Sequence, residues 1–221
     1  MKEIILDEKE HKYTVDGKEL ISCTTFLSKY FPKFDAEKKA EEMGKRDGRE
    51  PQDILDDWKE IAKQGTLVHE EIEKYINDGL MPQSSKGLMG AHWCQTNQGD
   101  DELVSEMRVF SEELGIAGTI DLVIKHKPVV GCLKQRVTLS DWKTNKAIYR
   151  KCFGRGGLKE ASHLADCNYN KYQLQLSLYA YILEKEYDVV VDGIVLVHLK
   201  DGGFKDYRMD VLRELIEEMV K

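Results

Sequence analysis

The chain has 221 residues, which fits one α/β domain with a sizeable core, and its 41% apolar content is ordinary for a globular protein. The net charge of −7 argues against a protein that coats nucleic acid through a uniformly basic surface, but it is compatible with a local basic groove. No apolar run approaches the length of a membrane span, and acidic residues occur too early within residues 1–7 for a signal peptide. We therefore expect an intracellular protein without membrane contact.

The five cysteines are scattered along the chain and odd in number. No two of them form a Cys-x-x-Cys pair, so we expect neither a disulfide framework nor a compact zinc site. An iron–sulfur cluster would need four of these distant positions to converge, and we expect none. Reduced and mostly buried thiols are predicted at Cys23, Cys94, Cys132, Cys152 and Cys167.

The first third of the chain predicts a hairpin followed by helices. Residues 4–20 contain the turn dipeptide Asp16-Gly17, which favours a β-hairpin. Cap-forming residues at 22–25 predict the start of a short helix. The charged stretch 35–48 is helical in character, and Pro51 opens a further helix.

The helix that starts at Pro51, or a second helix after Gly65, carries His69. Its apolar residues recur at helical spacing, and Glu73 lies four residues after His69 on the same face. A lone histidine on a helix is more often structural than a ligand, so His69 gains weight only from its surroundings.

The middle and the end of the chain alternate between strands and helices. Residues 79–100 are polar and Gly-rich and predict a connection with a short helix around 88–94. Strands are expected near 106–112, 119–124 and 136–142, with a turn at 125–134. A helix at 172–187, strands at 189–199 and 204–209, and a terminal helix at 211–220 complete the expected order, with a break in the first of these strands at Asp192-Gly193.

Asp121, Asp141 and Lys143 lie on two neighbouring expected strands. Because alternate side chains share a face, Asp141 and Lys143 point the same way and Trp142 points to the other side. If the two strands pair, Asp121 approaches Asp141, and two converging carboxylates repel one another unless a cation lies between them. Magnesium or manganese prefers such oxygen ligands, and the ion would activate a water for attack on a phosphodiester, with Lys143 neutralising the transition state.

Two simpler interpretations remain open for these residues. Aspartate followed two residues later by lysine is often a surface ion pair worth roughly 0–1 kcal/mol, and Asp121 would then be an edge-strand charge. The run 143–159 is likewise the clearest charge anomaly of an acidic chain, and most such runs are solvated loops. It has no acidic residue and carries Lys143, Lys146, Arg150, Lys151, Arg155 and Lys159.

The ordered set around these residues resembles the PD-(D/E)XK nuclease superfamily, in particular its RecB-like branch of phage and mitochondrial genome maintenance exonucleases and CRISPR adaptation nucleases. Residues 22–25 are also similar to the opening of phage-type members. The histidine motif is matched by Gly65-Thr66-Leu67-Val68-His69, and the acidic residue before the central hairpin is matched by Glu106, with Glu102 and Glu112 as rivals. The glycine-to-aspartate motif is matched by Gly118-Thr119-Ile120-Asp121, and the (D/E)XK motif by Asp141-Trp142-Lys143-Thr144. The QxxxY helix is matched by Gln175-Leu176-Ser177-Leu178-Tyr179.

The resemblance implies a fold and a role for each residue. The fold is a restriction-endonuclease-like α/β domain, a mixed central sheet flanked by helices, with the hairpin and helical region 1–64 packed on a core of 65–221. Asp121 and Asp141 would bind one or two Mg²⁺ or Mn²⁺ ions, helped by His69 and the Trp142 carbonyl. Lys143 would be catalytic, and Glu106 would act through water or a second ion. The DNA would be held by Gln175, Tyr179, Lys146, Arg150, Lys151 and Arg155, with Tyr149, Phe153, Tyr169 or Tyr172 stacking on bases.

The resemblance therefore predicts a metal-dependent DNA exonuclease that acts on single-stranded DNA or on a free end. Its expected setting is phage or mobile-element recombination or replication in the cytoplasm of a bacterium or an infected host cell, with recombination or replication proteins as partners. The alternative is a non-catalytic DNA-binding or scaffold protein on the same fold, which the complete set of Asp121, Asp141 and Lys143 argues against. The chain has no phosphate-binding loop of the helicase type, so we expect no intrinsic motor.

Overall fold

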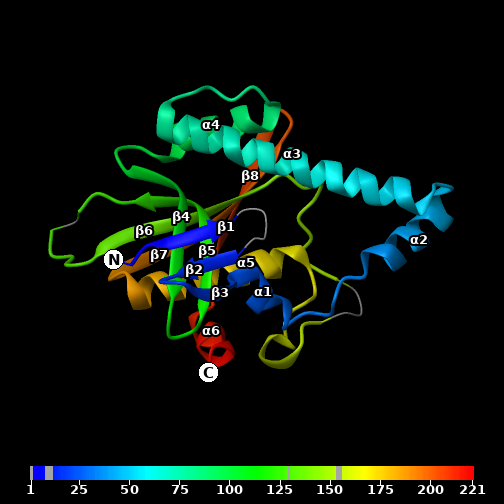
Figure 1. The fold of residues 1–221 in the computed structure, drawn as a ribbon. Helices are drawn as coiled ribbons and strands as arrows, with labels where there is room; N and C mark the ends of the chain where they lie inside the picture. Colours follow the sequence, from blue (N-terminus) through cyan, green and yellow to red (C-terminus); the bar gives the residue numbers. More distant parts are fainter. Residues whose placement is uncertain (1, 8–11, 129, 153–155) are drawn as a thin grey trace.

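The computed structural model describes residues 2–7, 12–128, 130–152 and 156–221. In this part of the chain, eight strands form one mixed sheet flanked by helices, which confirms the predicted α/β class (Figure 1). The strands are β1 (Ile4–Asp7), β2 (Lys12–Val15), β3 (Lys18–Ser22), β4 (Glu102–Ser111), β5 (Ile116–Lys125), β6 (Gln135–Lys143), β7 (Val189–Lys200) and β8 (Gly203–Met209). The helices are α1 (Cys23–Ser28), α2 (Ala36–Asp47), α3 (Pro51–Asp78), α4 (Ser85–Asn97), α5 (Asn168–Glu186) and α6 (Arg213–Met219), with a 3₁₀ turn at Lys159–Ala161.

The strand pairing is interrupted along one edge of β5. On its other edge, β5 pairs antiparallel with β4 over almost its whole length. On the interrupted edge it pairs in parallel with β3 at residues 116–117 and antiparallel with β6 at residues 122–125. Among the described residues, no strand pairs with residues 118–121 on that edge. The glycine-to-aspartate motif therefore borders the point where the sheet forks.

The N-terminal strands join this sheet rather than only covering it. The predicted hairpin is present as β2 and β3, and Asp16 and Gly17 form its turn with φ of 50° and 78°. Two successive left-handed residues suit a two-residue turn that matches the twist of the strands. A further strand, β1, pairs with β2, and β3 continues into β5.

Helix α3 is one continuous helix of 28 residues that passes through Gly65 without a break. A Cβ atom at Gly65 would lie 3.1 Å from Thr144 Oγ1, so the glycine allows the helix to approach the end of β6. Helix α4 is longer than the predicted 88–94, because Ser84 Oγ accepts a hydrogen bond from the Gly87 amide and caps it. The remaining boundaries differ from expectation by a few residues, and the largest differences are at the starts of β4 and α5, which begin at Glu102 and Asn168.

The expected break at Asp192-Gly193 is a bulge within a continuous strand. Val137 pairs with Val191 and Thr138 pairs with Gly193, so the register skips Asp192. One extra residue in β7 is accommodated in this way without ending the strand.

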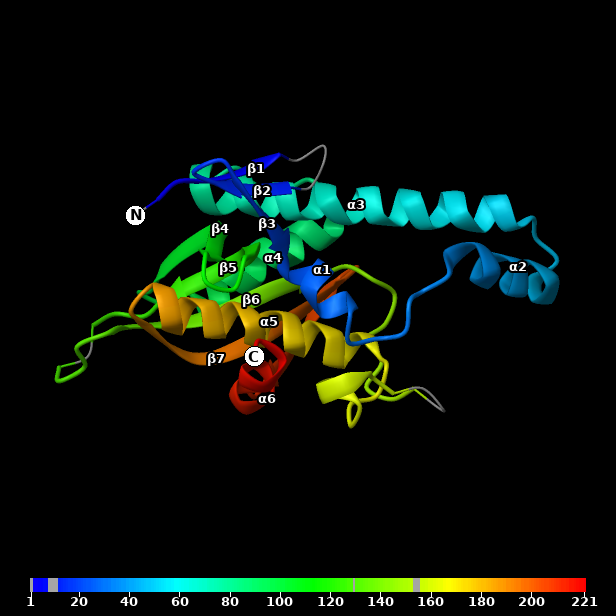
Figure 2. The same cartoon turned by 60° about the horizontal axis from the view of Figure 1, so that its bottom comes forward.

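Helices pack against both faces of the sheet (Figure 2). On one face, α5 contributes Leu174, Leu178 and Ile182 to the larger hydrophobic cluster. On the other face, α3 and α4 contribute Val68, Ile72 and Trp93 to a second cluster around Trp142. No helix among the described residues is both long and apolar enough to cross a membrane.

Gly118 should be intolerant of a methyl group. Its Cβ position lies 2.5 Å from Tyr179 Cε1 and 3.1 Å from Cys23 Sγ, both buried. We expect Gly118→Ala to lower the free energy of unfolding by about 1–3 kcal/mol in urea denaturation, because overpacking forces side chains off their rotamers. Gly193→Ala is the matched control in the same sheet, since its Cβ meets nothing within 4 Å. Equal effects of the two substitutions would contradict this prediction.

Candidate metal centre

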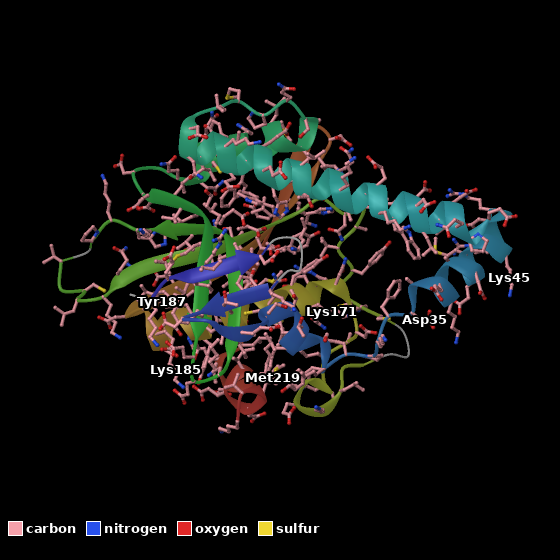
Figure 3. The ribbon with its side chains drawn as sticks, viewed as in Figure 1. Asp35, Lys45, Lys171, Lys185, Tyr187 and Met219 are labelled. Carbon is pink, nitrogen blue, oxygen red and sulfur yellow. The ribbon has the colours of Figure 1, made fainter. Side chains whose placement is uncertain are left out.

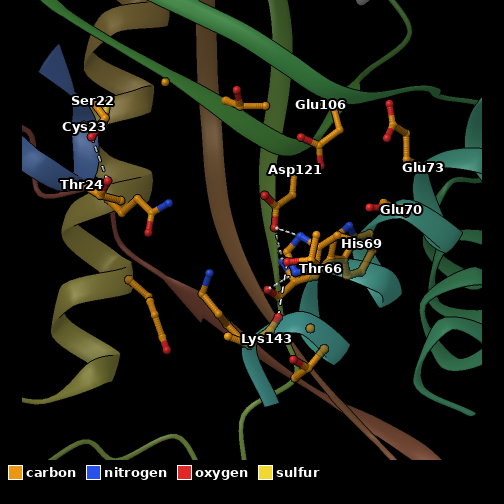
Figure 4. A pocket seen from close by; sticks show the side chains of 18 of the residues that line it. Ser22, Cys23, Thr24, Thr66, His69, Glu70, Glu73, Glu106, Asp121 and Lys143 are labelled. Atoms are coloured by element: carbon orange, nitrogen blue, oxygen red, sulfur yellow. Dashed lines mark hydrogen bonds and ion pairs between the residues drawn. The ribbon is translucent and has the colours of Figure 1, made fainter. Parts of the chain in front are cut away.

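The candidate site is a cavity of about 740 Å³ at the fork of the sheet. Its wall is built from α3, β4, β5, the end of β6, α5, the start of α1 and the N-terminal strands β1 to β3. Figure 4 shows Glu106 and Asp121 side by side, with His69 facing Asp121 and Lys143 below them in this view. The sequence therefore identified residues that are far apart in the chain and share one cavity.

Three side chains form a cluster that can hold a metal ion. One ligand atom each from His69, Glu106 and Asp121 lies within 4.8 Å of the other two. His69 Nδ1 is 3.4 Å from Asp121 Oδ2. One imidazole and two carboxylates match the ligand preferences of divalent cations such as Mn²⁺. The residues present therefore fit a divalent ion.

Glu106 occupies its place through an unusual backbone conformation. The pairs Ser105–Leu122 and Met107–Ile120 flank it, so Glu106 lies opposite Asp121 across the two strands. Its φ of 50° is left-handed, which is uncommon for a residue other than glycine and costs on the order of 1 kcal/mol. Such strain persists where the surrounding structure enforces it, and here it directs the Glu106 carboxyl toward Asp121. The rival Glu102 is exposed and forms an ion pair with Lys125, which follows Asp121 by four residues in β5.

The carboxyl groups of the site destabilise one another. Burial, followed by the nearby Asp121 and Glu73 charges, raises the pKa of Glu106 to about 8. Burial also raises the pKa of Asp141 to about 6, against the opposing effect of Lys143 and with a further contribution from Asp121. A bound cation would relieve this repulsion, which is a second reason that the residues fit one.

Asp141 and Lys143 form an ion pair beside the cluster. Lys143 Nζ lies 2.6 Å from Asp141 Oδ2, and both side chains are largely buried. Burial alone would lower the pKa of Lys143, but the Asp141 and Asp121 carboxylates raise it, so the ammonium stays charged. It also lies 4.6 Å from the ring centroid of Tyr172. Asp141, predicted as a metal ligand, directs Oδ2 at Lys143 and is not one of the three residues whose ligand atoms cluster, so its ligation stays a prediction.

The backbone of Trp142 connects the cluster to the ion pair. Its N–H donates to Asp121 Oδ2 at 2.9 Å, and its carbonyl lies 3.1 Å from His69 Nε2. The indole points to the opposite face, as the alternation predicted, and its centroid lies 5.3 Å from that of Trp93. The Trp142 carbonyl, a predicted ligand, is therefore adjacent to the cluster through His69.

The predicted DNA-binding residues divide into two groups. Gln175 and Tyr179 line the cavity, and Gln175 Nε2 donates to the Tyr179 hydroxyl at 3.3 Å. Lys146, Arg150 and Lys151 are exposed and lie outside the cavity wall. Arg155 and Phe153 lie outside the described residues.

Two side chains not singled out by the sequence hold the segment that follows Lys143. Lys86 Nζ donates to the Thr144 carbonyl at 2.9 Å, and His198 Nε2 lies 2.6 Å from the Asn145 carbonyl oxygen. They come from α4 and β7, so only the register of distant elements brings them here. Tyr13, Ser22 and Thr24 also line the cavity, and the sequence gives no sign of this beyond the resemblance of residues 22–25 to phage-type openings.

No protein-family model matches the chain, and no curated protein matches it.

A divalent ion should stabilise the folded chain through this cluster. Binding to the native state alone adds about 2.7 kcal/mol at an ion concentration 100-fold above Kd, so Mn²⁺ should raise the melting temperature by several degrees. Asp121→Asn should abolish the shift, because it removes a carboxylate ligand. Asp100→Asn, at an exposed carboxylate, is the matched control and should keep it. A shift that survives in Asp121→Asn would place the ion elsewhere.

Glu106 should make the stability of the metal-free chain depend on pH. Since its pKa in the folded chain is about 8, above the ordinary 4.5, the free energy of unfolding falls as the pH rises between these values. Without divalent ions, Glu106→Gln should therefore stabilise the chain by roughly 2 kcal/mol near pH 8 and by little near pH 4.5 in urea denaturation. Glu102→Gln, on the same strand but exposed, should show no such dependence. A stabilisation by Glu106→Gln that is the same at both pH values would contradict the raised pKa.

Proposed function

We propose that the chain is a metal-dependent deoxyribonuclease of the PD-(D/E)XK type, which hydrolyses phosphodiester bonds in DNA. The observation that carries the proposal is the meeting of two groups of side chains in one cavity. The cluster of His69, Glu106 and Asp121 can hold a cation, and the Asp141–Lys143 pair lies directly beside it. An anionic phosphodiester would meet positive charge from both groups there.

The metal ligands in this proposal are His69, Glu106 and Asp121, with Mg²⁺ or Mn²⁺ as the ion. A bound ion would supply positive charge for the phosphoryl oxygens and would lower the pKa of the attacking water. The hydrogen bond of the Trp142 N–H fixes the orientation of the Asp121 carboxylate. Contact with the Trp142 carbonyl fixes the imidazole of His69, as outer partners do for ligands in metal sites.

Lys143 provides the charge that the chain itself offers to the reaction. Asp141 and the Tyr172 ring hold its ammonium in one position at the edge of the cavity. A fixed cation needs no reorganisation as negative charge grows on the phosphoryl oxygens, so it stabilises the transition state more than a mobile one. Gln175 and Tyr179 would orient the bound strand through their amide and hydroxyl groups.

The exonuclease mode and the setting follow from the resemblance. We propose degradation from a DNA end, in phage or mobile-element recombination or replication, in the cytoplasm of a bacterium or an infected cell. The partners would be DNA and the proteins of that process.

Lys143→Ala should lower DNA hydrolysis by at least about 100-fold, because the transition state loses its fixed cation. The assay follows end-labelled single- and double-stranded DNA with Mg²⁺ or Mn²⁺, and a chelator should abolish cleavage by the wild type. Lys45→Ala is the matched control, since it removes an exposed lysine that does not line the cavity and has no predicted role in the site. Equal cleavage by Lys143→Ala and wild type would refute the site. DNA binding by a wild type inactive in both metals would instead favour the non-catalytic scaffold.

A further inference from the structure

Outside the cavity, two cations lie against a pair of tyrosine rings. The Arg150 guanidinium is 4.7 Å from the ring centroid of Tyr169 and 5.4 Å from that of Tyr207. Lys205 Nζ lies 5.0 Å from the centroid of the same Tyr207 ring. The two rings meet edge to face, with centroids 6.0 Å apart. We call these four residues the cation–tyrosine ladder.

The ladder leads to the candidate metal centre by two routes. Along α5, Tyr169 and Tyr172 are three residues apart and share a face, and the Lys143 ammonium lies over the ring of Tyr172. Across the sheet, Lys143 pairs with His198 on β7, and His198 pairs with Lys205 on β8. Since neighbouring strands are about 4.8 Å apart, the backbone of Lys205 lies roughly 10 Å from that of Lys143.

The cations of the ladder keep their charge available to a ligand. Many other basic residues of this acidic chain pair with carboxylates, as Arg136 does with Asp192 at 2.8 Å. Arg150 and Lys205 have no carboxylate partner among the residues that the structure describes. An aromatic face attracts and orients a cation but does not neutralise it. Both side chains are exposed, so a bound anion can reach them.

We propose that the cation–tyrosine ladder binds the phosphates of a single polynucleotide strand whose scissile bond lies at the metal centre. This inference rests on the proposed function and adds a path for the bound strand, which the basic run alone does not define. Lys205 and Tyr207 enter from β8, more than forty residues after that run ends at Lys159. The strand thus leaves the site across the start of α5 toward β8.

The dimensions of the ladder favour one strand over a duplex. A DNA strand carries one phosphate per about 3.4 Å of helix axis, so the roughly 10 Å between the backbones of Lys143 and Lys205 corresponds to about three phosphates of one strand. The second strand of a duplex would lie across a groove about 6–12 Å wide, and the ladder provides no cation for its phosphates there. The planar guanidinium of Arg150 suits bidentate hydrogen bonding to a phosphate, and the two tyrosine rings limit its rotation.

The test is binding of a fluorescent single-stranded oligonucleotide, followed by anisotropy in the presence of a chelator at several salt concentrations. Lys205→Ala and Arg150→Ala should each weaken binding by about threefold or more and reduce the slope of log K against log salt by about 0.7, the value for one lost phosphate contact. Lys45→Ala is the matched control, because this exposed lysine lies at the outer end of α2 (Figure 3). It should change neither quantity.

Further outcomes separate this inference from the proposed function. A wild type that neither binds nor cleaves single-stranded DNA would overturn both. A wild type that binds and cleaves, with the slope of Lys205→Ala equal to that of Lys45→Ala, would overturn the ladder alone. A lower melting temperature of Arg150→Ala without a change in slope would mean that Arg150 only anchors its loop. An equal loss of affinity for a blunt duplex would overturn the restriction to a single strand.

Discussion

The two hydrogen-bonding groups of the Trp142 backbone hold the candidate site together. The N–H fixes Asp121 from β5, and the carbonyl contacts His69 from α3. Strand alternation then places Asp141 and Lys143 on the face that carries the chemistry and the indole in the core of the other face. A shift of this strand by one residue would exchange the two faces, so the packing of the indole against Trp93 determines the register on which the site depends.

The charged groups of the site lower the free energy of unfolding of the metal-free chain. The raised pKa of Glu106, the strained φ of the same residue and the buried carboxyl of Asp141 all oppose folding of the metal-free chain. Two well-packed hydrophobic clusters, one on each face of the sheet, offset these costs. Local departure from the rules of stable folding is expected where a protein binds or reacts with a ligand.

Local sequence patterns were sufficient to predict that Asp121, Asp141 and Lys143 lie near one another, whereas His69 and Glu106 joined the predicted site only through the resemblance. Asp121, Asp141 and Lys143 follow from strand alternation and from the adjacency of consecutive strands, which are short-range properties. The conformation of Glu106 could not be foreseen, because only the opposing strand and the helix around it enforce a left-handed φ. The sequence does not decide whether α3 is continuous, because glycine is a poor helix former and the close approach of Gly65 to Thr144 joins residues far apart in the chain. Lys205 and His198 lie near the site only because β6, β7 and β8 pair with one another.

The fork in β5 divides the sheet into parts of unequal cohesion. In the part of the chain that the structure describes, the N-terminal strands pair with β5 at Ile21–Ile116 and Ser22–Ala117. The hydrogen bond between Tyr13 and Thr119 and a small apolar cluster that contains Tyr13 and Ala117 support this pairing. The strands β5, β6, β7 and β8 are joined by longer ladders. Segments with few shared hydrogen bonds open at lower free energy than the core, so we expect this part of the cavity wall to open before the central strands. Amide hydrogens of β2 and β3 would then exchange with solvent faster than those of β6, and the cavity would open on that side while His69, Glu106 and Asp121 stay in place.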